Sequence, residues 1–423
     1  MTSAQDLARR CVPPSLPTVD LHRILVGFAL DPASPEYRAP LNHVHHSRDL
    51  ADPQDRSVVN LNVDTPYSYA WLDLRGGPVL LTMPAHEPDR YMSAQLVDLY
   101  THIVGYVSPR TGGTAGGAFL VRGPSKAGPA VDADEVFDCP TDLCLVLVRT
   151  QLFDDADLPN VARLQDEVTL EPLGFPRPAP TGWPAPVDVR APLDAGFLEA
   201  MDWMLQFMPR LPEDTNIRAD LAELGCGTGQ VADLLSVLDV AAQVRTGLEQ
   251  GRQDVLARCA TVRSSAELFG SREMLSGDDL TRAAGAYLGI LGNAAEEYLG
   301  VGYHGDSHGR PFDGQHGYTI RFAPDGLPPV DAFWSITLYD AGQHLYANEL
   351  SRYSLGTRQL PGMLRDPDGG LTVHVQHDRP SPQLLANWLP APQAPFGLTF
   401  RTYLPRDAIR DGSWTAPPVT RTP

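Results

Sequence analysis

The sequence contains very little lysine. Lys126 is the only lysine among 33 basic residues, so almost every positive charge is carried by arginine. Lys126 is therefore the only residue that could supply a Schiff-base amine or a P-loop ammonium group. It lies in the sequence Gly-Pro-Ser-Lys-Ala-Gly-Pro, which is typical of an exposed turn.

Long apolar runs, signal sequences and paired cysteines are also missing. No run reaches the roughly 18 apolar residues that a membrane span needs, and the N-terminus lacks the apolar core of a secretion signal. The five cysteines are scattered without CxxC spacing, which argues against a disulfide framework or a zinc knuckle. The net charge of −19 opposes binding to nucleic acid or an anionic membrane. We expect a cytoplasmic protein with a small-molecule substrate and neither of those partners; the sequence leaves open whether it forms a homo-oligomer.

Length and turn residues predict two β-rich domains. A chain of 423 residues is long for one domain, and 40 prolines with 37 glycines favour many short strands. We expect an N-terminal β-rich domain over residues 18–192, a helical segment over 193–300 and a C-terminal β-sandwich over 301–423. The predicted fold class is mainly β with an α-helical middle segment (α+β), built from two β-sandwich or jelly-roll-like domains.

Hydrophobic periodicity supports this division. Residues 143–148 are nearly all apolar, which predicts a central strand buried on both faces. Residues 91–97 and 398–403 separate into two faces at the period of a strand. Between these regions, Phe and Met side chains recur at helical spacing over residues 197–208.

Several sequence blocks resemble a known family. The blocks that carry the resemblance are NVDTPYS at 62–68, WLDL at 71–74, QLVDLY at 95–100, PNVARLQ at 159–165, LPPVDAFWSITLYD at 327–340, NELSRYS at 348–354, NWLPAP at 387–392 and RTY at 401–403. Together they resemble a bacterial family that joins two domains of unknown function, DUF1254 and DUF1214. The resemblance implies two β-sandwich-like domains with helices between them, and little about activity.

The chain departs from the family pattern near its first block. Pro66 stands where the family pattern has Leu, and the neighbourhood of His43 is richer in histidine. Many relatives carry export signals, whereas this chain shows none. A specialised cytoplasmic role, such as a step in biosynthesis, is therefore a hypothesis.

Residues 220–229 read like the glycine loop of an S-adenosylmethionine-dependent methyltransferase. Glu249 follows at about the distance expected for an acidic ribose ligand, roughly 20 residues on. Such a loop needs a strand before it, and the sequence around it is helical. We therefore favour a helix boundary over a cofactor loop.

The histidine-rich segment is a candidate metal site. His43 and His45 would share one face of a strand, and Asp49 or Asp64 would add a carboxylate. One divalent metal that activates water would suit this set. The alternative is that these histidines are surface or hydrogen-bonded residues, and the cofactor stays undetermined.

The Asn62–Tyr67 segment is the strongest candidate for an active site. Asn, Asp and Thr in a row can cap a turn. In the functional interpretation, Asp64 is a general base or metal ligand, Asn62 and Tyr67 donate hydrogen bonds, and His46 supplies the histidine for acid–base chemistry.

Several polar side chains of the strands are candidates for binding a substrate carboxylate or sugar hydroxyls. The candidates are Arg149, Arg352, Tyr353, Arg401, Tyr403 and Asp98. Buried arginines normally need carboxylate partners, so the same residues could instead lock the two domains together.

Three functions therefore compete. The first is a hydrolase or lyase that acts on a small polar molecule by carboxylate and histidine chemistry. The second is a non-catalytic protein that binds a carbohydrate or a similar small ligand. The third, disfavoured, is a methyltransferase. The absence of Gly-x-Ser-x-Gly and His-Glu-x-x-His motifs weakens the readings as a serine hydrolase or zinc protease.

Overall fold

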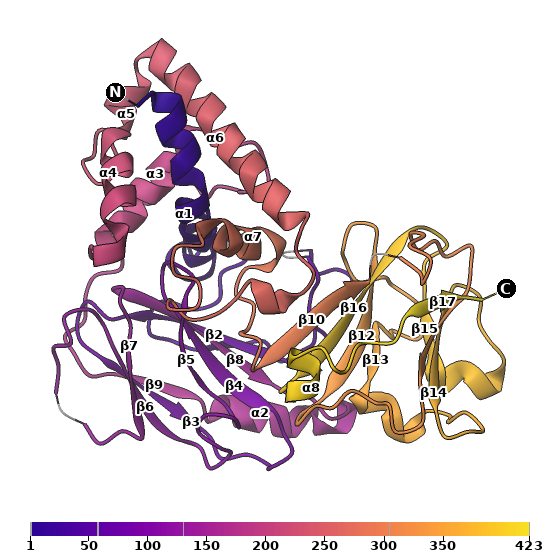
Figure 1. Ribbon diagram of the computed structural model, residues 1–423. Helices are drawn as coiled ribbons and strands as arrows, with labels where there is room; N and C mark the ends of the chain where they lie inside the picture. Colours follow the sequence, from indigo (N-terminus) through magenta and orange to yellow (C-terminus); the bar gives the residue numbers. More distant parts are fainter. Residues whose placement is uncertain (1, 57–58, 130, 304, 423) are drawn as a thin grey trace.

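A computed structural model describes residues 2–56, 59–129, 131–303 and 305–422. It contains two β-sheet regions and a group of helices that rises above the first of them (Figure 1). The fold class predicted from the sequence, mainly β with an α-helical middle segment, is confirmed.

The N-terminal region is a sandwich of two sheets. One sheet has the order β1 (His45–His46), β2 (Tyr67–Asp73), β8 (Leu143–Thr150), β4 (Met92–Val97) and β5 (Ile103–Val107). The other has the order β7 (Glu135–Asp138), β6 (Gly117–Arg122), β3 (Val79–Met83) and β9 (Thr169–Pro172). Apolar side chains from both sheets form a shared core.

The five-stranded sheet is covered on its other face by helices. The side chains of Trp71, Leu145 and Val97 point away from the core between the two sheets. They pack with residues of the helices in a second core. All eight residues of β8 are consequently buried, which confirms the prediction of a central strand covered on both faces.

The helices form one packed group. Its members are α1 (Ala4–Leu25), α3 (Ala195–Met204), α4 (Thr215–Glu223), α5 (Val231–Leu235), α6 (Leu238–Cys259) and α7 (Asp279–Gly289). Two further helices, α2 (Leu158–Asp166) and α8 (Asp407–Arg410), lie beside the sheets (Figure 1). Among the helices of the described residues, none is both long and apolar enough to span a bilayer.

Helix α1 was not expected, and the predicted domain start at residue 18 lies inside it. Pro13, Pro14 and Pro17 occur within the helix, and interior prolines normally break one. Fourteen of its 22 residues are buried, chiefly against α6, α7 and the five-stranded sheet. This burial outweighs the lost backbone hydrogen bonds.

The C-terminal region is a second sandwich. One sheet has the order β10 (Tyr298–Tyr303), β16 (Phe396–Tyr403), β12 (Trp334–Asp340) and β13 (Ser354–Gly356). The other has the order β15 (Trp388–Pro390), β14 (Leu371–Gln376), β11 (Tyr318–Phe322) and β17 (Val419–Arg421). Alternate residues of β12 and β16 fill the core between the sheets, as the sequence periodicity predicts.

The glycine-rich segment is not a nucleotide-binding loop. Gly225–Gly229 lies between α4 and α5, with positive φ at Gly225, Gly227 and Gly229. A methyltransferase loop follows a strand, whereas this one follows a helix. The helix-boundary interpretation therefore agrees with the structure.

Candidate functional site

The outer face of the sheet of β10, β16 and β12 carries polar side chains, and residues 60–67 of the N-terminal region lie across it. Arg401 on β16 donates from Nη2 to the carbonyl of Asn60 at 2.9 Å. Ser335 on β12 donates from its hydroxyl to Asp64 Oδ2 at 2.7 Å. We call this contact between the two β regions the junction.

Asn62 links the two regions directly. Its side-chain nitrogen lies 2.8 Å from Thr65 Oγ1, 3.1 Å from the Tyr67 phenol oxygen and 2.9 Å from that of Tyr403. Its side-chain oxygen accepts from the backbone N–H of Asp64 at 2.7 Å. The turn-capping role predicted from the sequence is therefore present, and the same side chain also reaches across the junction.

Arg149 ends β8 on the junction side of the five-stranded sheet. It pairs with Tyr67 in the strand register, and its guanidinium carbon lies 5.3 Å from the centre of the Tyr67 ring. It donates from Nη1 to Gln95 Oε1 at 2.7 Å and from Nη2 to the carbonyl of Leu291 at 2.9 Å. No carboxylate oxygen among the described residues lies within 4.0 Å of this buried charge.

Arg401 is a second buried arginine without a carboxylate partner within that distance in the part of the chain described. Only 4% of the residue is exposed. Besides Asn60, Nη2 contacts the Tyr339 phenol at 2.6 Å, and that phenol donates to the carbonyl of Leu61 at 2.6 Å. Nη1 has no hydrogen-bond partner among the described residues. Burial opposes the charge, but Tyr339 and neighbouring acidic groups outweigh it and raise the pKa of Arg401.

Asp64 lies close to this charge and remains partly exposed. Burial raises the pKa of Asp64, although Arg401 and the hydrogen bond from Ser335 act in the opposite direction. Ser335 also pairs with Arg401 across the ladder of β12 and β16. The carboxyl group of Asp64 and the guanidinium of Arg401 therefore both neighbour Ser335. The raised pKa of Asp64 suits a group that transfers protons.

The junction thus brings together six of the predicted residues, namely Asn62, Asp64, Tyr67, Arg149, Arg401 and Tyr403. Sequence reasoning missed Tyr298, Ser335 and Tyr339. The available signal was their position, since Ser335 and Tyr339 alternate with core residues of β12 and so belong to its outer face.

Three predicted binding residues, Arg352, Tyr353 and Asp98, make contacts outside the junction. Arg352 donates from Nη1 to the carbonyls of Leu385 and Trp388, at 2.6 and 2.9 Å, and so stabilises a turn of the second sandwich. Tyr353 packs in a small apolar cluster with Val63 and Tyr339 beside the junction.

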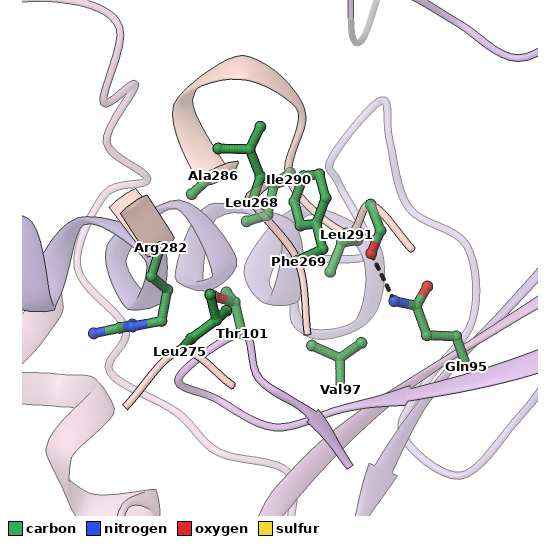
Figure 2. A pocket seen from close by; sticks show the side chains of 11 residues that line it. Gln95, Val97, Thr101, Leu268, Phe269, Leu275, Arg282, Ala286, Ile290 and Leu291 are labelled. Atoms are coloured by element: carbon green, nitrogen blue, oxygen red, sulfur yellow. Dashed lines mark hydrogen bonds between the residues drawn. The ribbon is translucent and has the colours of Figure 1, made fainter. Parts of the chain in front are cut away.

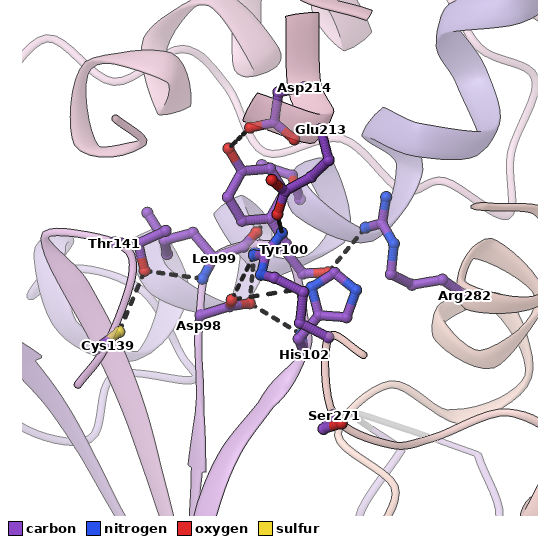
Figure 3. A network of polar contacts seen from close by, with 12 residues as sticks. Asp98, Leu99, Tyr100, His102, Cys139, Thr141, Glu213, Asp214, Ser271 and Arg282 are labelled. Carbon is purple, nitrogen blue, oxygen red and sulfur yellow. Dashed lines mark hydrogen bonds and ion pairs between the residues drawn. The ribbon is translucent and has the colours of Figure 1, made fainter. Parts of the chain in front are cut away.

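Asp98 belongs to a separate polar network between the five-stranded sheet and the helices (Figure 3). It forms an ion pair with Arg272 at 2.8 Å and accepts hydrogen bonds from the backbone N–H groups of Tyr100 and His102. Tyr100 donates to Asp214, on the helical side. Asp98 therefore ties the helices to the sheet, and its predicted role in substrate binding is not supported by its position.

The histidines lie away from the junction. His46 Nδ1 is 2.8 Å from the Ser68 hydroxyl, and Ser68 points to the opposite face of β2 from Tyr67. Burial lowers the pKa of His46 to about 4. The structure therefore places the catalytic candidate His46 apart from Asn62 and Tyr67, because residues 67 and 68 alternate in the strand.

The predicted metal ligands are not gathered into a metal site. His43 precedes β1 and contacts the carbonyl of Leu41 at 2.9 Å, while His45 pairs with Tyr69 within the sheet. Among the residues that the structure covers, no group of three or more His, Cys, Asp or Glu side chains is arranged to hold a metal ion.

Figure 2 shows a small pocket lined in part by Gln95 and Leu291, both of which accept hydrogen bonds from Arg149. Gln95, which holds Arg149, also donates to the carbonyl of Gly292 at 2.8 Å. The pocket is lined by Gln95, Val97, Thr101, Leu268, Phe269, Leu275, Arg282, Ala286, Ile290, Leu291 and Gly292. Most of these side chains are apolar.

The comparisons with known proteins agree with the two-region architecture. Residues 41–172 match the family model described as "Protein of unknown function (DUF1254)". Residues 298–407 match the one described as "Protein of unknown function (DUF1214)". A comparison with curated proteins returned no match.

One solved structure shows the same fold. The crystal structure of the VPA0106 protein from Vibrio parahaemolyticus aligns over 100% of both chains, with a TM-score of 0.78 and 23% identity. An uncharacterized protein from Burkholderia cenocepacia aligns over 97% of this chain and 87% of its own, with a TM-score of 0.45 and 12% identity. At this level of identity the first structure supports the fold alone.

Proposed function

The chain belongs to the family that carries DUF1254 in its N-terminal half and DUF1214 in its C-terminal half, and from this premise we propose that the junction of the two is an active site. The site acts on a small polar molecule by hydrolysis or elimination. Asp64 is its general acid–base, and Arg401 stabilises negative charge on the reacting molecule.

One observation carries this proposal. The carboxyl group of Asp64 has a pKa raised by burial, and it lies near a buried guanidinium whose Nη1 has no partner in the described part of the chain. Structural ion pairs normally satisfy the donors of a buried arginine, whereas here one donor nitrogen is left over. A recessed carboxylate next to an available donor is the arrangement that acid–base chemistry uses.

The two reactions use these groups in similar ways. In an elimination, Asp64 takes a proton from carbon, the leaving group departs from the adjacent carbon with the bonding electron pair, and the protonated Asp64 returns the proton to it. In a hydrolysis, Asp64 takes a proton from water while the water oxygen bonds to a carbonyl carbon and the C=O π electrons move onto the carbonyl oxygen. The carbonyl then re-forms, the bond to the leaving alkoxide breaks, and the protonated Asp64 gives its proton to that alkoxide. In both, negative charge grows on an oxygen that Arg401 can stabilise.

The test is a mass-spectrometric screen for turnover. The protein is incubated with a defined mixture of small hydroxy acids, lactones, esters and sugar acids. We expect one compound to gain or lose the mass of a water molecule. Asp64→Asn should slow that conversion by about 10²–10⁴-fold, the usual contribution of a general base.

Asp142→Asn is the matched control. Burial also raises the pKa of Asp142, but its carboxylate is influenced by Arg75 and Asp73 rather than by the junction. This variant should turn over at the native rate. Unchanged turnover in Asp64→Asn, or no conversion of any compound by the native protein, would overturn the proposal.

A non-catalytic binding site is the second candidate. The junction is rich in hydrogen-bonded side chains, and Asn62 connects the phenols of Tyr67 and Tyr403. Such a network can hold a ligand without reacting with it. Ligand binding that stays intact in every variant, together with no conversion of the mixture, would favour this candidate.

A further inference from the structure

We propose that a second pocket, at one end of the N-terminal sandwich, binds a single Cu⁺ ion through Met83, Met92 and His86. The site is separate from the junction, and the inference does not depend on the function proposed there. Methionine sulfur is a ligand of a different kind from the His, Cys, Asp and Glu side chains, which form no such group among the described residues.

The pocket lies where the connection from β3 to β4 crosses from one sheet of the sandwich to the other. Met83 is the last residue of β3 and Met92 is the first of β4, and both side chains belong to the core between the sheets. His86 lies on the connection itself, and all three residues line the pocket. The stretch 83–92 therefore brings two thioethers and one imidazole to the same small space.

His86 has the hydrogen bond and the protonation state of a metal ligand. Its Nδ1 lies 3.1 Å from the carbonyl oxygen of Glu87, which can only accept, so Nδ1 carries the proton and Nε2 keeps its lone pair. Histidines that bind metals are commonly fixed by a backbone carbonyl in this way. Burial lowers the pKa of His86, so the imidazole is neutral at about pH 7.

The available ligands favour a soft monovalent ion over the common divalent ions. Thioether sulfur suits Cu⁺, whereas Zn²⁺ sites use thiolate, imidazole and carboxylate groups, and Ca²⁺ sites use oxygen. No carboxylate is among the described residues that line the pocket, and the carboxylate of Glu87 is bound by Arg90. The hydroxyl of Ser108, which does line it, donates to Glu297 at 2.7 Å. Three uncharged ligands without a balancing anion match an ion of charge +1.

The pocket has room for one small guest and borders an exposed loop. Its cavity volume is about 10 Å³, close to what a single water molecule needs, so a metal ion fits and an organic molecule does not. The exposed residues Gly112 and Gly113 form part of its wall, and no atom lies within 4 Å of a Cβ added to Gly113. The backbone N–H of His86 donates to the carbonyl of Thr114 at 2.9 Å, which holds this loop against the connection.

Methionine also fills gaps in apolar cores without binding anything. Met201 and Met204 pack in this way among the apolar residues of the helical core. Met83 and Met92 differ from them because they share a cavity with an imidazole. This combination of two thioethers, one imidazole and an atom-sized space carries the inference.

The test is a titration of the intact protein with Cu⁺. The protein is freed of metal and titrated anaerobically in competition with bicinchoninate, which absorbs visible light when it binds Cu⁺. Ag⁺ has the same charge and similar softness, and it serves as a second probe in titration calorimetry. We expect the protein to bind one equivalent of either ion, and X-ray absorption at the copper edge to show both sulfur and nitrogen neighbours.

Met83→Leu, Met92→Leu and His86→Gln should each weaken Cu⁺ binding by about 100-fold or more, because losing even a partner of a metal ligand costs about 10- to 100-fold. Leucine keeps the apolar volume of methionine, so the two core variants should remain folded. His86 lies outside the core, so His86→Gln keeps the test decisive if a core variant does not fold. Met201→Leu is the matched control, since Met201 is buried away from the pocket, and it should bind Cu⁺ as the native protein does.

Thiols are the main competing ligands for Cu⁺. Cys259 is the one partly exposed cysteine of the five, and Cys259→Ala should bind the ion as tightly as the native protein. Loss of binding in Cys259→Ala, with unchanged binding in Met83→Leu, Met92→Leu and His86→Gln, would overturn the proposal. Equal affinity of Met83→Leu and Met201→Leu would overturn it too, as would binding of Zn²⁺ in place of Cu⁺.

Discussion

The phenol of Tyr298 lies directly over Gly300 in strand β10. A Cβ atom added to Gly300 would lie 2.5 Å from the Tyr298 phenol oxygen, closer than such contacts occur. Gly300 pairs with Arg401 across the ladder, so the missing side chain is what lets the phenol lie beside the guanidinium. Burial raises the pKa of Tyr298, which keeps this phenol protonated and able to donate a hydrogen bond.

Gly300→Ala should therefore displace Tyr298 from its position beside Arg401. The φ angle of Gly300 is not in the left-handed region, so alanine causes no backbone strain and the effect is one of contact alone. We expect a loss of about 1–3 kcal/mol in unfolding free energy from overpacking, measured by urea unfolding. Gly397→Ala in strand β16 is the control, because no atom lies within 4 Å of its added Cβ. Equal behaviour of the two variants would contradict the role of Gly300.

Six residues of the junction could be predicted from the sequence, but Tyr298, Ser335 and Tyr339 were missed, and the contact between the two regions could not be predicted. Polar residues in the turn at 62–67 and the shared strand face of Arg401 and Tyr403 were both visible as patterns, and the structure confirms that face. The contact between them depends on how the two sandwiches pack, which local periodicity does not encode. The position of His46 could not be predicted, because it depends on the register of β1 on β2. This register sets His46 opposite Ser68, on the face of the sheet away from Tyr67.

The fold was predictable where periodicity was regular. Strands such as β3 and β11 occupy the segments that alternate or are continuously apolar in the sequence. Helix α1 was missed because three prolines normally end a helix, and only its burial against α6, α7 and the sheet explains why it persists. Helices α6 and α7 lie more than 200 positions away in the chain, and the strands of the sheet are also distant in sequence, so no local pattern could reveal this burial.

Asp64→Asn should change how stability depends on pH. Burial raises the pKa of Asp64 in the folded protein above its ordinary value of 3.8. As the pH rises from 3.8 through the raised value, the unfolded chain releases this proton before the folded chain does, so the native protein loses stability.

The Asn variant lacks this loss. It should match the native protein below a pH of about 3.8 and be more stable at neutral pH. Urea unfolding across this range is the measurement, and a variant that is less stable at neutral pH would contradict burial as the main influence on Asp64.

His22 should produce the opposite dependence. It is fully buried in α1 against Trp203, and both ring nitrogens are without hydrogen-bond partners in the described residues. Burial lowers the pKa of His22 from 6.5 to about 4. The folded protein therefore has its full stability above 6.5 and loses it as the pH falls toward 4, by about 3 kcal/mol.

His22→Phe should remove this loss while keeping the contact with Trp203. Urea unfolding at about pH 7 and about pH 4.5 would show a smaller difference for the variant than for the native protein. The exposed His43 offers a control, since His43→Asn should leave the difference unchanged. An identical pH dependence in His22→Phe would place the acid sensitivity elsewhere.

Two glycines set the distance between α1 and α6. A Cβ on Gly247 would lie 2.1 Å from the carbonyl oxygen of Gln5, and one on Gly251 would lie 2.6 Å from that of Arg9. From Gly247 to Gly251 the contact moves four residues along α6, and from Gln5 to Arg9 it moves four residues along α1. The two helices therefore run in the same direction. Glycine to alanine in a helix usually stabilises a protein by about 0.5–1 kcal/mol.

At Gly247 and Gly251, alanine should instead destabilise the protein. Gly247→Ala or Gly251→Ala forces the α6 backbone away from α1, and we expect a loss of about 1–3 kcal/mol or more, measured by urea unfolding. Gly289→Ala in α7 is the control, because its added Cβ meets no atom within 4 Å, and it should stabilise the protein by about 0.5–1 kcal/mol. Stabilisation by Gly247→Ala would show that α1 and α6 do not pack this closely in solution.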